Sequence, residues 1–216
     1  MSYAEIAKQA KNRGLIVMGA LHPRAAYSAD DKVGTIVLLG TGADFWPVFS
    51  QAPEHLDAAP NPVDRWSKRV VGEIAQPIAA ECSFPSDGPP YPPFISWALN
   101  TGRFFQSPVG VMVHNTVGLM VSLRGALHLR QEILLPAPTG TSPCNTCSAP
   151  CTTACPVSAL SAEAPYNLSA CHDFLDTSDG AGCMARGCIA RRACPLSVGA
   201  ARTNAQSALH MKAFHP

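Results

Sequence analysis

The residues in this chain that could do chemistry are cysteines gathered near its end. Eight of the nine cysteines lie between Cys144 and Cys194. The first four read C-x2-C-x3-C-x3-C-P, which differs from the iron–sulfur run C-x2-C-x2-C-x3-C-P by one residue inserted before the third cysteine. Thiolates on such a turning loop can reach several corners of a 4Fe-4S cluster. The spacing therefore predicts a protein that moves electrons.

The cysteines are more widely spaced in the second half of the block, where Cys171 stands alone before three others. In proteins with two clusters, the last cysteine of one run binds the cluster of the other run. By analogy with this rule, we expect one 4Fe-4S cluster to be bound by Cys144, Cys147, Cys151 and Cys194. We expect the other cluster to be bound by Cys155, Cys171, Cys183 and Cys188.

Three arginines are interleaved with the second set of cysteines: Arg186, Arg191 and Arg192. A 4Fe-4S cluster with four thiolates carries roughly two negative charges when oxidised, and burying it requires nearby cations or amide donors. The arginines are candidates for these counter-charges. A solvated basic turn is the alternative interpretation.

Disulfides and structural zinc are the alternatives to clusters. A disulfide framework would explain an even number of cysteines, but the N-terminus lacks the charged start, apolar stretch and cleavage site of a secretory signal. Structural zinc favours two C-x2-C pairs, and the chain has one. Clusters are therefore the preferred interpretation.

Composition places the chain among ordinary globular proteins. Its 216 residues are long enough for one domain and a smaller second one, and 47% are hydrophobic. A net charge of +1 without a long basic run gives no electrostatic case for nucleic acid, which we therefore do not expect as a partner. The longest apolar stretches are too short to span a bilayer, so we expect a cytoplasmic protein without membrane contact.

The composition changes at residues 134–143, L-L-P-A-P-T-G-T-S-P, which indicates a boundary near residue 140. We expect domains at 1–140 and 141–216, the second ending in a closing helix over 201–214. In the first domain, periodicity predicts helices at 4–12, 43–50, 61–75 and 94–103 and strands at 14–21, 33–40 and 78–82. Asn61 and Pro62 have the pattern of a helix start. A strand pair at 109–114 and 118–134, joined by the turn N-T-V-G, completes an α+β layer fold.

The cysteine block resembles that of epoxyqueuosine reductase, a cobalamin-dependent family with two clusters, down to the fifteen residues between Cys155 and Cys171. Upstream, D-G-P-P, a helix and V-G-V-M-V-H-N-T are similar to that family's D-x-A-P segment, helix and G-W-I-G-K-N-T loop. The resemblance puts Asp87 at the position of a catalytic proton donor. It puts Asn115 and Thr116 near a corrinoid, with His114 where the family has lysine. For an aspartate in a turn, the alternative is a local turn former, and for a lone histidine it is a packed or solvated ring.

The first domain also resembles CblC-type cobalamin-processing proteins, through N-P-V-D-R-W and G-V-M-V-H-N-T-V-G-L-M-V-S-L-R-G-A-L. Both resemblances imply a flavin-reductase or nitroreductase-like sheet-and-helix domain, here followed by a small dicluster ferredoxin-like domain. No D-x-H-x-x-G signature of a histidine-ligated cobalamin occurs. The chain ends without the helical repeats associated with tRNA binding in the reductase, so a tRNA substrate is not expected.

Together these patterns predict an iron–sulfur redox protein that passes electrons to a corrinoid, or to a flavin, bound by its first domain. An electron-donor or electron-acceptor protein is the expected partner. The main alternative is a ferredoxin-like carrier that docks to a partner enzyme and has no cofactor chemistry of its own. A third interpretation is an assembly or sensing protein whose clusters report redox state.

Overall fold

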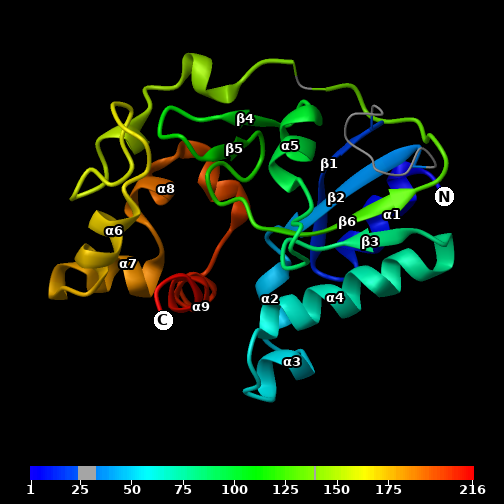
Figure 1. Ribbon diagram of the computed structural model, residues 1–216, viewed down its shortest axis with the longest axis horizontal. Coiled ribbons are helices and arrows are strands. Elements are labelled where there is room, and N and C mark those ends of the chain that lie inside the picture. Colours follow the sequence, from blue (N-terminus) through cyan, green and yellow to red (C-terminus); the bar gives the residue numbers. More distant parts are fainter. Residues whose placement is uncertain (24–32, 139) are drawn as a thin grey trace. The chain divides into compact units, whose positions relative to one another are not determined.

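The computed structural model describes residues 1–23, 33–138 and 140–216, which divide into two compact units (Figure 1). The first unit contains Met1–Phe104 and Ser122–Gly140, and the second contains Phe105–Val121 and Thr141–Pro216. All residues after Gly140 belong to the second unit, and this boundary lies within the segment where the composition changes. Thr139 in that segment lies outside the described residues. The expected domain 1–140 differs from the first unit of the structure in one respect: residues 105–121 belong to the second unit.

A four-stranded antiparallel sheet forms the centre of the first unit. Its strands are β1 (Leu15–Leu21), β2 (Thr35–Thr41), β3 (Glu81–Ser83) and β6 (Leu123–Leu129), in the order β1-β2-β6-β3. Every residue of β2 is buried, as its unbroken apolar run requires of a central strand. The expected strands at 14–21 and 33–40 are confirmed.

Helices cover both faces of this sheet (Figure 1). They are α1 (Tyr3–Lys11), α4 (Pro62–Ala75) and α5 (Phe94–Asn100). On β6, Gly125 faces Val71 of α4, whereas the ring of His128 contacts Trp97 of α5 at 5.3 Å between centroids. Successive residues of a strand point to opposite faces, so α4 and α5 lie on opposite sides of the sheet.

Two short helices, α2 (Phe45–Phe49) and α3 (Pro53–Leu56), extend the core beside α4. The rings of Phe45 and Phe49 stack at 5.1 Å, and both meet the ring of Trp66 edge-on. Arg69 of α4 binds Glu54 of α3 through two hydrogen bonds, of 2.6 and 3.0 Å. The three helices therefore pack as one body.

Three expectations for the first domain need correction. Asn61 precedes α4 as expected, but it has a left-handed backbone and its side chain makes no capping hydrogen bond. The third strand is Glu81–Ser83 rather than 78–82, because Gln76–Ile78 forms a 3₁₀ turn (η1). The expected strand pair at 109–114 and 118–134 was wrong. Strand β5 (Met112–His114) pairs with β4 (Phe104–Gln106), whereas β6 joins the large sheet.

The second unit consists mainly of short helices connected by tight turns. Its helices are α6 (Leu168–Leu175), α7 (Ala181–Arg186), α8 (Ile189–Ala193) and α9 (Asn204–Phe214), with 3₁₀ turns η2 (Pro143–Thr146), η3 (Pro150–Thr152), η4 (Ser178–Gly180) and η5 (Pro195–Ala200). The expected closing helix is α9. It buries Gln206 and Ser207, while Phe214 is 39% exposed. Within the described residues, no helix is long and apolar enough to cross a membrane.

Candidate metal centre

Four cysteines of the second unit line one small cavity: Cys144, Cys147, Cys151 and Cys194. They come from η2, the residue after it, η3 and the junction of α8 with η5. Apolar side chains, among them Val113 and Leu119, complete the wall. The structure thus brings together the four residues expected to bind the first cluster.

Local hydrogen bonds turn the chain around this cavity. The amide of Cys144 donates to Ser142 Oγ at 3.3 Å, and the amide of Cys147 donates to the Cys144 carbonyl at 3.2 Å. The amide of Ala149 donates to Cys147 Sγ at 3.4 Å. An N–H group aimed at a ligand sulfur is an interaction that tunes iron–sulfur centres.

The other four cysteines line a second, separate cavity: Cys155, Cys171, Cys183 and Cys188. Cys171 lies on α6 and Cys183 on α7, while Cys188 immediately precedes α8. Gly187 takes a φ of +85° between them and donates its amide to the Cys183 carbonyl at 2.8 Å. This backbone conformation favours glycine and reverses the chain between α7 and α8.

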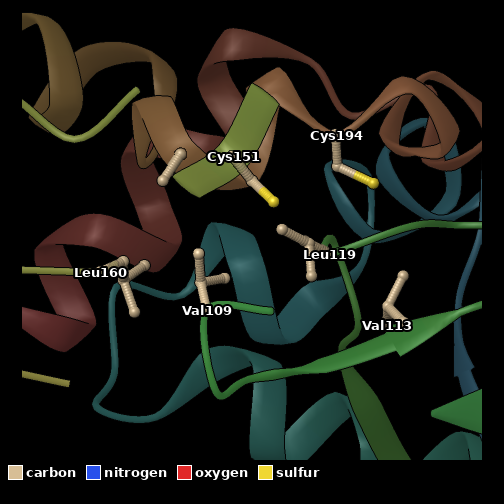
Figure 2. Close-up of a cluster of buried hydrophobic side chains, with 7 residues drawn as sticks. Val109, Val113, Leu119, Cys151, Leu160 and Cys194 are labelled. Atoms are coloured by element: carbon tan, nitrogen blue, oxygen red, sulfur yellow. The ribbon is translucent and has the colours of Figure 1, made fainter. Parts of the chain in front are cut away.

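Cysteines of the first set belong to the apolar core of the second unit. Cys151 and Cys194 are buried in one cluster with Val109, Val113, Leu119, Leu160 and Ala190. Figure 2 shows both sulfur-bearing side chains beside Leu119. A cluster bound here would therefore be largely shielded from water.

Burial changes the acidity of these thiols. It raises the pKa of Cys144, Cys151 and Cys188 above the ordinary value, and neighbouring thiolates add to the increase. Arg191 acts in the opposite direction on the pKa of Cys188. A bound metal ion supplies the positive charge that allows such thiols to lose their protons.

Arginines hold the segment 119–121 against the cysteine-bearing helices. Arg191 donates to the carbonyls of Leu119 and Val121 at 2.6 and 3.1 Å, and Arg202 donates to the carbonyl of Met120 at 3.0 Å. These bonds explain why 105–121 belongs to the second unit. Of the three expected counter-charges, Arg191 lies near the Cys188 thiol, whereas Arg192 donates to the Gly187 carbonyl and Arg186 is exposed.

The sequence patterns gave no reason to single out Tyr166. Its side chain lines the same cavity as Cys171, and its pKa is raised by burial and by this neighbouring thiol. No motif marks a lone tyrosine eleven residues after Cys155. Only the folded arrangement reveals its contact with a candidate ligand.

The remaining candidate residues are engaged locally. Asp87, in the first unit, accepts the amide of Phe84 at 2.8 Å and pairs with Lys68 at 3.3 Å. His114, in the second unit, is 2% exposed, and its Nδ1 accepts the amides of Thr116 and Val117 at 3.1 and 3.4 Å. Asn115 accepts the hydroxyl of Thr116 within the same turn. Asp87 therefore shapes its own turn, and His114 the turn that follows β5.

All nine cysteines are free of disulfides. Among the described residues, no three histidine, cysteine, aspartate or glutamate side chains are grouped closely enough to share one metal ion. A 4Fe-4S cluster does not require such a group, because each of its irons takes one protein thiolate.

Solved structures of epoxyqueuosine reductase are similar to this chain. One, from Streptococcus thermophilus, is 17% identical, with a TM-score of 0.48 over 91% of this chain and 66% of that one. Another, with an epoxyqueuosine-modified tRNA-Tyr stem loop, is 13% identical, with a TM-score of 0.51 over 95% of this chain and 68% of that one. The chain shares the fold of this second structure.

The likeness to this second structure supports a mixed α+β fold, and its 13% identity supports no statement about activity. The chain spans just under two thirds of the Streptococcus thermophilus protein. No protein-family model matches the sequence, and no curated protein matches it.

Proposed function

We propose that this protein is an iron–sulfur electron-transfer protein with two 4Fe-4S clusters in its second unit. One observation carries the proposal: eight cysteines divide into two sets of four, and each set lines its own cavity. The first cluster would be bound by Cys144, Cys147, Cys151 and Cys194. The second would be bound by Cys155, Cys171, Cys183 and Cys188.

The chemistry of the two cavities suits this group. Each donor set is made only of thiols, and apolar side chains surround both. The amide of Ala149 donates to Cys147 Sγ, and the hydroxyl of Tyr166 lies beside Cys171. When bound, such clusters accept and release single electrons. The protein residues position the sulfurs, keep water away and set the electrostatic surroundings.

Anaerobic reconstitution followed by iron and sulfide analysis tests this proposal. The protein should hold about eight irons and eight acid-labile sulfides per chain. Cys82→Ser is the matched control, because Cys82 lies on β3 in the first unit, and it should leave the content unchanged. Stoichiometric zinc without sulfide would contradict the proposal.

We further propose that the electrons pass to a corrinoid, or alternatively to a flavin, through a first unit of flavin-reductase-like fold. The sequence resemblances and the shared fold support this. His114 does not fit the part of a cobalt ligand, since it is buried and its Nδ1 accepts two amides. An absorbance titration of the cluster-loaded protein with hydroxocobalamin, and separately with flavin mononucleotide, tests the acceptor. The proposal fails if neither binds.

A ferredoxin-like carrier without its own cofactor is the second candidate. The local engagement of Asp87 and His114 favours it, because both residues have structural roles in their own turns. It predicts reducible clusters, no stoichiometric organic cofactor and tight association with a partner enzyme. Cobalt and flavin analysis after anaerobic purification separates the two candidates.

We also propose that the protein can bind a tRNA stem loop, although its net charge of +1 gave no reason to expect nucleic acid. One of the similar structures contains a tRNA stem loop. A mobility-shift assay with a tRNA anticodon stem loop at low and moderate salt measures the interaction directly. Binding that weakens steeply with salt would indicate phosphate contacts.

A further inference from the structure

The second unit contains another cavity, of about 340 Å³, which the two cysteine sites do not account for. All of its lining residues belong to this one unit. They come from β5, from the segment 119–121, from α6, α8 and α9, and from residues that connect or precede these elements, such as Tyr166 and Arg202. This volume is at the lower end of the range for small-molecule sites.

Most of the cavity wall is apolar and adaptable. Met112, Met120 and Met211 line it together with Phe214. Methionine side chains adjust to irregular shapes and make favourable contacts with aromatic rings. Such walls suit a flat, apolar ring system.

Two arginines give the cavity a polar side. Arg191 and Arg202 line it, and no aspartate or glutamate is among its described lining residues. Arg191 is held in place by its bonds to the Leu119 and Val121 carbonyls, which use two of its five N–H donors. Fixed guanidinium groups in apolar surroundings bind oxygen acceptors such as carbonyl and carboxylate groups.

The cavity adjoins the second cysteine set. Cys171 and Cys188 line both this cavity and the cysteine site, and Tyr166 lines this cavity beside Cys171. A ligand here would lie next to two of the sulfurs that we assign to the second cluster. An entire corrinoid is too large for this volume.

We propose that this cavity binds a small, flat ring compound with a carbonyl or carboxylate oxygen, its ring against the methionines and its oxygen toward the arginines. Its place beside an electron-carrying centre rests on the proposed function. The binding itself rests only on the cavity.

Ligand-detected NMR titration of the full chain with three probes of one shape tests this. The probes are 2-naphthoate, 2-acetylnaphthalene and 2-ethylnaphthalene, of which the last lacks oxygen. At least one oxygen-bearing probe should bind fivefold or more tightly than 2-ethylnaphthalene. Equal affinity for all three, or no binding, would overturn the proposal.

Matched variants place the probe in the cavity. Met112→Trp fills it and should abolish binding, whereas Met184→Trp alters a methionine outside the lining and should not. Arg202→Gln should remove the preference for oxygen, and the exposed Arg186→Gln should keep it. If Met112→Trp does not fold, as judged by circular dichroism, Val121→Phe serves the same purpose. Unchanged binding in a folded cavity variant would refute the assignment.

Iron content, measured on each sample, keeps the two proposals apart. Binding by protein that cannot be loaded with clusters would support the cavity site and contradict the electron-transfer function. Full cluster content without binding would contradict the cavity site alone.

Discussion

Arg191 donates from Nε to the main-chain oxygen of Leu119 over 2.6 Å, joining positions 72 residues apart in the sequence. Ser197 closes the connection: its hydroxyl donates to the Arg191 carbonyl at 2.7 Å and accepts the Leu119 amide at 3.2 Å. Arg191 and Ser197 flank Cys194. This network therefore fixes a candidate cluster ligand against the segment 105–121.

Replacing Arg191 with methionine should destabilise the second unit. The Leu119 and Val121 carbonyls would lose a charged donor, and hydrogen bonds to charged groups contribute about 1.5–3 kcal/mol each. We expect the free energy of unfolding to fall by about 3–6 kcal/mol, twice the contribution of one such bond, measured by urea denaturation of the cluster-free protein. The exposed Arg186→Met is the control. Equal stability of the two variants would show that the network contributes little.

Tyr166→Phe should lower the reduction potential of the second cluster. The Tyr166 hydroxyl lies beside Cys171, where a hydrogen bond to the sulfur would stabilise the more negative, reduced state more than the oxidised one, and phenylalanine removes this donor. A net hydrogen bond of about 0.5–1.5 kcal/mol corresponds to about 20–65 mV for one electron. A redox titration followed by electron paramagnetic resonance measures this. Tyr91 is 70% exposed in the first unit, and the control variant Tyr91→Phe should leave the potential unchanged. A higher potential in Tyr166→Phe would contradict the role assigned to Tyr166.

Glu54→Gln should destabilise the first unit in a pH-dependent way. Hydrogen bonds from Arg69 lower the pKa of Glu54 below its ordinary value of 4.5. Its contribution to stability is thus present above that ordinary pKa and is lost as the pH falls through the lowered one. At pH 7 we expect a loss of about 1 kcal/mol, because the Arg69 side chain is 44% exposed.

Thermal unfolding of wild type and Glu54→Gln between pH 3 and pH 7 measures this effect. The difference in stability should shrink as the pH approaches 3. Exposed Glu163→Gln is the control. A difference that grows toward low pH would be opposite in sign to the prediction.

His215→Ala should loosen α9, which forms part of the 340 Å³ cavity. The His215 ring is 2.7 Å from His172 Nδ1 and 2.8 Å from Asp176 Oδ1, so it joins the end of α9 to α6. Losing both bonds should cost about 1–2 kcal/mol. Amide hydrogen exchange of residues 204–214 should then be faster than in the control variant Lys212→Ala, which changes an exposed side chain on the same helix. Unchanged exchange would show that α9 is held by its other contacts.

Much of the first unit could be predicted from the sequence, because its elements carry their own signals. The helical spacing in α1 and the unbroken apolar run of β2 each specify one structure. The predicted hairpin at 109–134 failed for a tertiary reason. Gly118 lies against Ser197, where a Cβ would come within 2.5 Å of the amide nitrogen, and Arg191 holds the residues that follow.

The candidate site was only partly accessible from sequence. The crossover rule of two-cluster proteins predicted how the eight cysteines divide, and the two cavities divide them in the same way. Tyr166 and the cavity beside Cys171 depend on how α6, α8 and α9 pack, and no spacing in the chain encodes that.

Double cysteine variants test the two-set assignment most directly. In Cys147→Ser with Cys194→Ser, both substitutions fall in the first set, so electron paramagnetic resonance of the reduced protein should still show about one cluster per chain. In Cys147→Ser with Cys155→Ser, each set loses a ligand, and both clusters should be lost. The reverse pattern would contradict the account, because it would mean that Cys155 rather than Cys194 completes the first set.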